Sequence, residues 1–183
     1  MKKIYVLFIL FSISVSGQME NFIVENSQVS WRKIYSTSNT QEEIIALIKK
    51  RNNLLITEIK KDIIEGQVSN LVMDHKKAGY SQLGTPEALS NDVRFSGFFN
   101  IEFKEGRYRV TARSITSQGG DYTLLIGNIP VTGNQNSSLE DIALDKYGKI
   151  KSNFKKSKAK IIDVTFDNLF DFTQTTEQKI NDW

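Results

Sequence analysis

The sequence predicts an α+β fold in which a curved antiparallel sheet carries two helices on one face. The clearest sign is residues 93–113, where apolar and polar residues alternate on both sides of a Glu105–Gly106 turn. Two other segments, beginning near Thr40 and near Phe154, repeat apolar residues at helical spacing. The predicted order is strand, helix, several antiparallel strands and helix, which is typical of an α+β fold with both helices on one sheet face.

The N-terminal segment has the three parts of a secretory signal peptide. Lys2 and Lys3 give a positive start, residues 4–13 an apolar run, and residues 14–18 a small-residue exit. The run is about half of the roughly 20 apolar residues that span a bilayer, which favours cleavage over anchoring. We therefore expect residues 1–17 to be a signal peptide and the protein to be exported, with periplasmic and extracellular destinations both open.

Composition excludes several classes of function. The chain has no cysteine, which removes disulfides, thiolate metal sites and cysteine nucleophiles. Without Lys2 and Lys3, 22 of the 24 basic residues remain against 21 acidic ones, a net charge of +1. A nucleic-acid-binding domain would carry a larger basic excess, so no nucleic-acid partner is expected.

The first predicted elements are a strand and a helix. Residues 28–35 alternate so that Trp31 and Tyr35 share one face with Val29 and Lys33. A helix follows, because Thr40 and Glu43 form a capping box. Its apolar stripe consists of Ile44, Ile45, Leu47 and Ile48.

The next segments predict two strands and a loop. Residues 54–60 and 67–73 read as strands, with the turn between them at residues 62–66. Residues 75–91 read as a long polar loop, in which His75, the single histidine of the chain, is expected to be solvated.

A two-residue turn at Glu105–Gly106 fixes the register of the hairpin that follows. On the core face this register pairs apolar residues: Phe103 with Tyr108, Ile101 with Val110, and Phe99 with Ala112. On the opposite face it pairs Glu102 with Arg109 and Phe98 with Arg113. A slip of one residue would destroy both sets of pairs, so the register is strongly specified.

The C-terminal third predicts one more strand, a loop and a long helix. Residues 122–126 read as a strand, and a loop rich in Gly, Asn and Pro continues to Asn136. Residues 138–144 read as a short helical turn, and apolar residues at helical spacing run from Phe154 to Phe170. One domain is therefore expected over residues 20–172, followed by a polar tail over residues 173–183.

The chain resembles a family of exported proteins from Bacteroidetes-type bacteria that carry a domain of unknown function with a TATA-binding-protein-like, helix-grip fold. The resemblance rests on the V-x-W segment Val29–Trp31, the hairpin Phe103–Val110, the lysine-rich run into a helix ending Leu169–Phe170, and the terminal Asp182–Trp183. It implies the fold and the exported location. It implies no catalytic residues, because the activity of the family is not established.

Residues 146–160 form the most unusual segment, with seven lysines and no acidic residue. Asp163, Asp167 and Asp171 follow toward the helix end, an order that opposes the helix dipole. One interpretation is a patch that binds an anionic surface such as lipid or glycan headgroups, and the other is a solvated helix face. The candidate surface residues are Lys149, Lys151, Lys155, Lys156, Lys158 and Lys160.

A second candidate surface lies on the outer face of the predicted hairpin. Four residues could bind a ligand there, three of them cationic and one aromatic: Arg94, Phe98, Arg109 and Arg113. Because Glu102 is expected to neutralise Arg109, a solvated sheet face is the competing interpretation.

These observations favour an exported, non-enzymatic binding or structural module whose ligand is open. The alternative is a peripheral cell-envelope protein held to an anionic surface by the lysine cluster, and a third possibility is a hydrolase that uses scattered carboxylates. No catalytic residue, metal or cofactor is expected. An envelope lipid, glycan or protein is an open partner class.

Overall fold

The computed structural model describes residues 19–126 and 129–173, with the side chains of residues 120–135 left out. The expected signal peptide, residues 1–17, lies outside the described residues. So do residues 174–183 of the expected tail, which include Asp182 and Trp183.

Within the described residues, seven strands form one antiparallel sheet in the order β1-β2-β6-β5-β4-β3, with β7 paired to the distal half of β6. The strands are β1 (Phe22–Glu25), β2 (Gln28–Ser36), β3 (Leu54–Lys60), β4 (Ile63–Leu71), β5 (Arg94–Lys104), β6 (Arg107–Ile126) and β7 (Ile129–Ser138). The described helices are α1 (Gln41–Lys49), α2 (Leu139–Ala143) and α3 (Ala159–Phe170), together with a 3₁₀ turn (Glu87–Leu89) and a π-helical segment (Phe154–Lys158).

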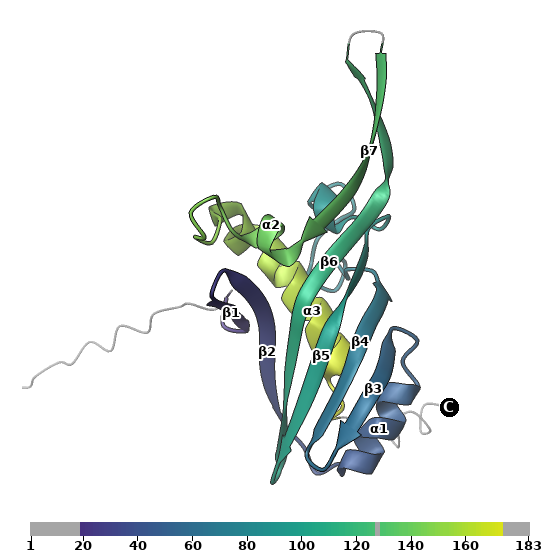
Figure 1. Cartoon of the computed structure of the whole chain (residues 1–183), viewed down its shortest axis with the longest axis vertical. Helices are drawn as coiled ribbons and strands as arrows, with labels where there is room; N and C mark the ends of the chain where they lie inside the picture. Colours follow the sequence, from purple (N-terminus) through teal and green to yellow (C-terminus); the bar gives the residue numbers. More distant parts are fainter. Residues whose placement is uncertain (1–18, 127–128, 174–183) are drawn as a thin grey trace, which may run out of the picture.

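Helices cover one face of the curved sheet and leave the other face open (Figure 1). The helix α3 crosses behind β2, β6 and β5, and the β6–β7 hairpin extends beyond the body of the sheet. The core lies between α3 and the sheet, where the Trp31 ring packs against Phe166 and Phe170 with centroids 5.5 and 6.0 Å apart. The predicted α+β class, with helices on one sheet face, is confirmed.

The predicted hairpin register is confirmed residue by residue. The pairs on the core face are Phe103 with Tyr108, Ile101 with Val110, and Phe99 with Ala112, and the outer pairs are Glu102 with Arg109 and Phe98 with Arg113. Ile101 and Val110 are fully buried. The predicted capping box at Thr40 and Glu43 is also present, and it starts α1 at Gln41.

The strand predicted at residues 67–73 begins earlier, at Ile63, and the turn predicted at residues 62–66 is wrong. Gly66 lies inside β4, paired with Ile56 on one side and Phe99 on the other. A Cβ atom at Gly66 would meet the Phe99 ring and the Leu55 carbonyl oxygen, each at 2.4 Å. The glycine therefore makes room for an aromatic ring from the next strand.

Two strands and one buried side chain differ from the prediction. β1 was not predicted, and β7 (Ile129–Ser138) occupies residues that were predicted as a loop up to Asn136 and as the start of a helical turn at Ser138. β7 pairs with β6 alone, which is an edge position where Pro130 is tolerated. His75, expected to be solvated, is only 3% exposed, because the loop that carries it folds back onto the core with Met73, Ala78 and Leu89.

Candidate functional site

The open sheet face carries polar side chains in rows that cross neighbouring strands. Arg32 of β2 pairs with Thr111 of β6, which in turn pairs with Asn100 of β5. In the next row, Arg113 of β6 pairs with Phe98 of β5. Because side chains alternate between the two faces of a strand, the burial of Trp31, Phe99 and Ala112 under α3 places these rows on the face away from the helix.

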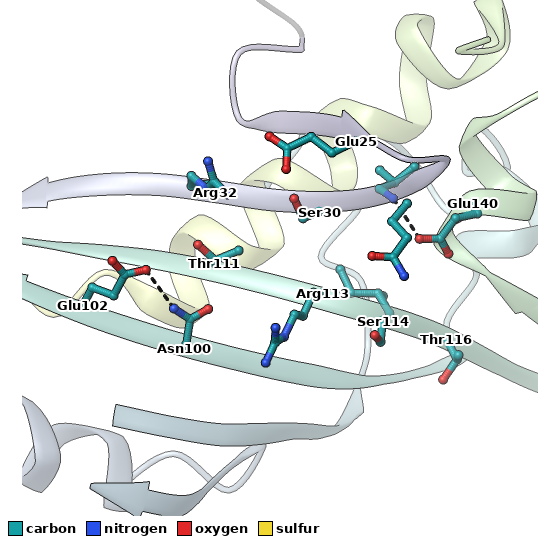
Figure 2. A pocket seen from close by; sticks show the side chains of 13 residues that line it. Glu25, Ser30, Arg32, Asn100, Glu102, Thr111, Arg113, Ser114, Thr116 and Glu140 are labelled. Carbon is teal, nitrogen blue, oxygen red and sulfur yellow. Dashed lines mark hydrogen bonds between the residues drawn. The ribbon is translucent and has the colours of Figure 1, made fainter. Parts of the chain in front are cut away.

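A hollow of about 550 Å³ lies over these rows. Figure 2 shows its lining on β1, β2, β5 and β6, with Glu140 at one end and Arg113 near the middle. Most of the lining side chains are polar: Glu25, Gln28, Ser30, Arg32, Asn100, Glu102, Thr111, Arg113, Ser114, Thr116 and Glu140. Val29 and Ile115 are the apolar members, and both are buried.

A β-bulge shapes one wall of this hollow. Between the pairs Phe98–Arg113 and Ser96–Thr116, β6 holds one residue more than β5. Ser114 lies in this bulge. Its φ of 50° is a left-handed conformation, which costs a serine some conformational energy. Arg113 and Ser114 are consequently both exposed and both line the hollow. Bulges commonly redirect side chains at functional sites.

Two arginines of the hollow have unused donors. The Nε of Arg32 is buried, and no described residue accepts a hydrogen bond from it. Arg113 is exposed, and it takes part in none of the ion pairs or side-chain hydrogen bonds found among the described residues. A buried, unpaired donor of a cation is costly without a partner, so this region of the hollow favours an acceptor.

The three carboxylates of the hollow differ in their partners. Glu102 forms an ion pair with Arg109 and accepts a hydrogen bond from the Asn100 amide at 3.0 Å. Glu140 accepts a hydrogen bond from the backbone N–H of Val29 at 2.8 Å, which ties α2 to β2. Among the described residues, only Glu25 lacks a hydrogen-bonding or ionic partner within this group.

The four predicted sheet-face residues are not gathered in one place. Arg113 lines the hollow, and Arg109 contributes through its ion pair with Glu102. Phe98 is 49% exposed beside Arg113, but the two make no cation–π contact among the described residues. Arg94 lies at the start of β5 and donates to the carbonyl oxygens of Asn91 and Val93.

The predicted lysine patch spans a loop, the π-helical segment and the start of α3. Lys149, Lys155, Lys156 and Lys160 are exposed, and Lys160 lies over the Tyr80 ring at 5.8 Å. The Lys151 ammonium donates to the carbonyl oxygen of Asp141. Burial lowers the pKa of Lys158, and the charge of Lys151 lowers it further. None of the six joins an ion pair among the described residues.

Neither a metal site nor a membrane-spanning helix is found in the part of the chain that the structure describes. The acidic residues and His75 do not form a group able to hold a metal ion there. The polar groups that line the hollow are arginine, amide, hydroxyl and carboxylate groups.

The sequence interpretation missed most of the hollow, Arg32 above all. One signal was present: the alternation that places Trp31 in the core also places Arg32 on the opposite face. The local pattern does not show that β2 pairs with β6. This pairing places Arg32 beside Thr111, which lies 79 positions later in the sequence (111 − 32).

Two solved structures are similar to this chain. One is a TBP-like protein from Parabacteroides distasonis, with a TM-score of 0.46 and 16% sequence identity over 81% of this chain and 91% of that chain. The other is a DUF4468 family protein from Bacteroides ovatus, with a TM-score of 0.47 and 15% identity over 82% of this chain and 86% of that chain. Both descriptions agree with the family that the sequence resembles, and neither assigns a ligand or an activity.

No family model matches the chain, and no curated protein is similar to it.

Proposed function

We propose that the protein is an exported, non-enzymatic binding module that holds a small polar ligand on the open face of its sheet. The observation that carries this proposal is the hollow of about 550 Å³ between β2, β6 and β5. Its size falls within the range of about 300–1,000 Å³ that ligand sites occupy. Arg32 and Arg113 offer donors there that the described protein groups do not use.

The carboxylates of the hollow favour binding over hydrolysis. Glycoside hydrolysis needs a free pair of carboxyl groups, one acting as the acid and the other as base or nucleophile. Glu102 is held by Arg109 and Asn100, and Glu140 is held by the backbone of Val29. This leaves Glu25 as the single carboxylate of the hollow that no described residue engages.

Export is part of the proposal because residues 1–17 have the charge, apolar run and small-residue exit of a cleaved signal. N-terminal sequencing of material from the cell envelope is expected to start at Gly17 or Gln18. Envelope material that begins at an intact Met1 would contradict cleavage.

The binding function is tested by blocking the hollow. Protein purified from its native envelope is analysed by native mass spectrometry for a co-purifying small molecule. Ser30→Trp places an indole in the hollow, and Gln67→Trp places the same side chain on β4 of the same face, outside the lining. We expect the bound mass in wild type and Gln67→Trp but not in Ser30→Trp. Equal retention in all three proteins, or no bound molecule in any, argues against the hollow.

A second candidate function is attachment to an anionic surface through the lysine cluster, defined as the six lysines from Lys149 to Lys160. Its support is the exposure of Lys149, Lys155, Lys156 and Lys160 without described ionic partners. A lysine near a charged membrane contributes about 1 kcal/mol, so several together suffice for diffuse attraction.

Vesicle co-sedimentation tests this second candidate. Wild type is expected to bind vesicles rich in anionic lipid at low salt and to be released as salt rises, because exposed charges are screened. Replacing Lys155, Lys156 and Lys158 with Gln should remove most of the binding. Replacing Lys61, Lys76 and Lys104, three exposed lysines outside the cluster, should not. Failure of the wild type to bind at low salt would end this candidate.

A further inference from the structure

We propose that the ligand of the hollow is an acidic carbohydrate whose carboxylate is held between Arg32 and Arg113. This inference rests on the proposed function, since it names the ligand class of the same site. It follows from three properties of the hollow: the position of its two arginines, its overall charge, and the nature of its remaining lining.

The two arginines are neighbours across adjacent strands. Arg32 pairs with Thr111, and Arg113 lies two residues further along β6 on the same face. Such diagonal neighbours are about 7–8 Å apart at the backbone, within reach of each other's long side chains. Guanidinium groups present a planar set of N–H donors that matches a carboxylate, and they remain charged at all relevant pH values. If the Arg32 side chain turns to meet a carboxylate between them, its Nε, which is buried and has no partner among the described residues, gains an acceptor.

The charge of the hollow limits the anion to a single negative charge. Glu102 is already neutralised by Arg109. What remains is Arg32 and Arg113 against Glu25 and Glu140, all of which line the same space. Because like charges repel at short range, a dianionic phosphate would meet two carboxylates, whereas a monoanion is matched by the arginines.

The rest of the lining fits hydroxyl groups better than apolar ones. Ser30, Asn100, Thr111, Ser114 and Thr116 supply short hydroxyl and amide groups that donate and accept hydrogen bonds. Val29 and Ile115 are only 1% and 2% exposed, so they offer almost no apolar surface. A fatty acid or the apolar side chains of a peptide would remain unburied here, whereas a sugar acid pairs its hydroxyls with this lining.

The test uses galacturonate, a monoanion, with its methyl ester and neutral galactose as the uncharged probes. Binding is measured by calorimetry, and the site is mapped by amide shifts in NMR spectra of isotope-labelled protein. We expect galacturonate to bind with shifts in β2, β5 and β6, and the ester and galactose to bind at least about tenfold more weakly, because a charge-assisted contact is lost.

Arginine variants assign the contact. Arg32→Gln and Arg113→Gln should each weaken galacturonate binding by about tenfold or more. Arg107→Gln, on the same strand and face but outside the hollow, should leave it unchanged. Thermal melts of all three variants establish that the fold is retained, and a variant that has unfolded is replaced by the corresponding lysine substitution, which keeps the charge but not the planar fork.

Three results would overturn the inference. If the ester binds as tightly as the acid with shifts in the hollow, the carboxylate contact is wrong while the proposed binding site stands. If galacturonate shifts the amide signals of the lysine cluster instead, the assignment to Arg32 and Arg113 is wrong. If no probe shifts the hollow at millimolar concentration, the acidic sugar is wrong, and the Ser30→Trp experiment decides separately whether the hollow binds anything.

Discussion

The indole N–H of Trp31 donates a hydrogen bond of 2.7 Å to the carboxylate of Asp163, which joins β2 to α3 inside the structure. The same carboxylate oxygen accepts from the Asn21 amide at 2.8 Å. One helical turn later, Asp167 accepts from the Tyr35 hydroxyl at 2.9 Å and forms an ion pair with Lys33 at 2.8 Å. Asp163 and Asp167, two of the aspartates that oppose the dipole of α3, are thus explained by their contacts with β2.

Removing the Asp163 carboxylate should destabilise the fold measurably. Asp163→Ala leaves the indole N–H of a fully buried Trp31 without its acceptor, which costs about 1–3 kcal/mol in the free energy of unfolding. Asp163→Asn keeps an acceptor oxygen and should cost less. Urea unfolding of both variants gives the comparison, and equal losses would show that the hydrogen bond to Trp31 contributes little.

The hairpin register makes a second prediction. Ile101 is fully buried, so Ile101→Ala should lower the free energy of unfolding by about 2–5 kcal/mol. Its neighbour Glu102 forms a partly exposed ion pair with Arg109, so Glu102→Ala should cost less than about 1 kcal/mol. Denaturant melts rank the two variants, and the opposite ranking would mean that the faces of β5 are reversed.

Gly66 makes a third prediction, because the Phe99 ring and the Leu55 carbonyl leave no room for a methyl group. Gly66→Ala should destabilise the protein by about 1–3 kcal/mol through forced displacement of β4 against its neighbours. Gly84→Ala is the matched control, since its nearest neighbour is the flexible Ser81 side chain at 3.3 Å. That control should change stability by less than about 0.5 kcal/mol. A neutral Gly66→Ala would place Gly66 in an open turn instead.

The parts of the fold that the sequence predicts are those determined by local pattern. The hairpin of β5 and β6 satisfies alternation on both faces at once, and the Thr40–Glu43 box marks the start of α1. The missed elements lack such signals. The turn between β1 and β2 consists of Asn26 and Ser27, both at positive φ. It lacks the glycine that usually indicates such a turn in a sequence.

The candidate site is less predictable because it depends on pairing between distant segments. Arg113 was singled out from its strand, but Arg32 becomes its neighbour only when β2 joins β6. The bulge at Ser114, which turns two successive side chains into the hollow, is a property of how β6 fits β5, and the glycine beside it, Gly97, lies on the opposite strand. The lysine cluster, by contrast, is a run of sequence and could be recognised as such.

The two buried tyrosines predict how stability depends on alkaline pH. Burial raises the pKa of Tyr35 well above its usual range, and the hydrogen bond to Asp167 raises it further. Burial also raises the pKa of Tyr108, although its hydrogen bond with the backbone of Phe172 acts in the opposite direction. Both hydroxyls therefore stay protonated in the folded protein at pH values where an unfolded tyrosine, with a pKa of about 10, releases its proton.

This difference in proton binding determines whether the free energy of unfolding rises or falls with pH. Below about pH 10 the folded and unfolded states both keep the tyrosine protons, so the stabilisation that the two protonated hydroxyls provide is fully present. Above it the unfolded state binds fewer protons, so the free energy of unfolding falls by up to about 1.4 kcal/mol per pH unit for each tyrosine. Urea unfolding from about pH 9 to pH 12 measures this slope. Tyr35→Phe should reduce the slope, and Tyr147→Phe, which removes a hydroxyl from a side chain that is 74% exposed, is the control. Equal slopes in wild type and Tyr35→Phe would mean that the Tyr35 hydroxyl titrates alike in both states, contrary to its enclosure beside Asp167.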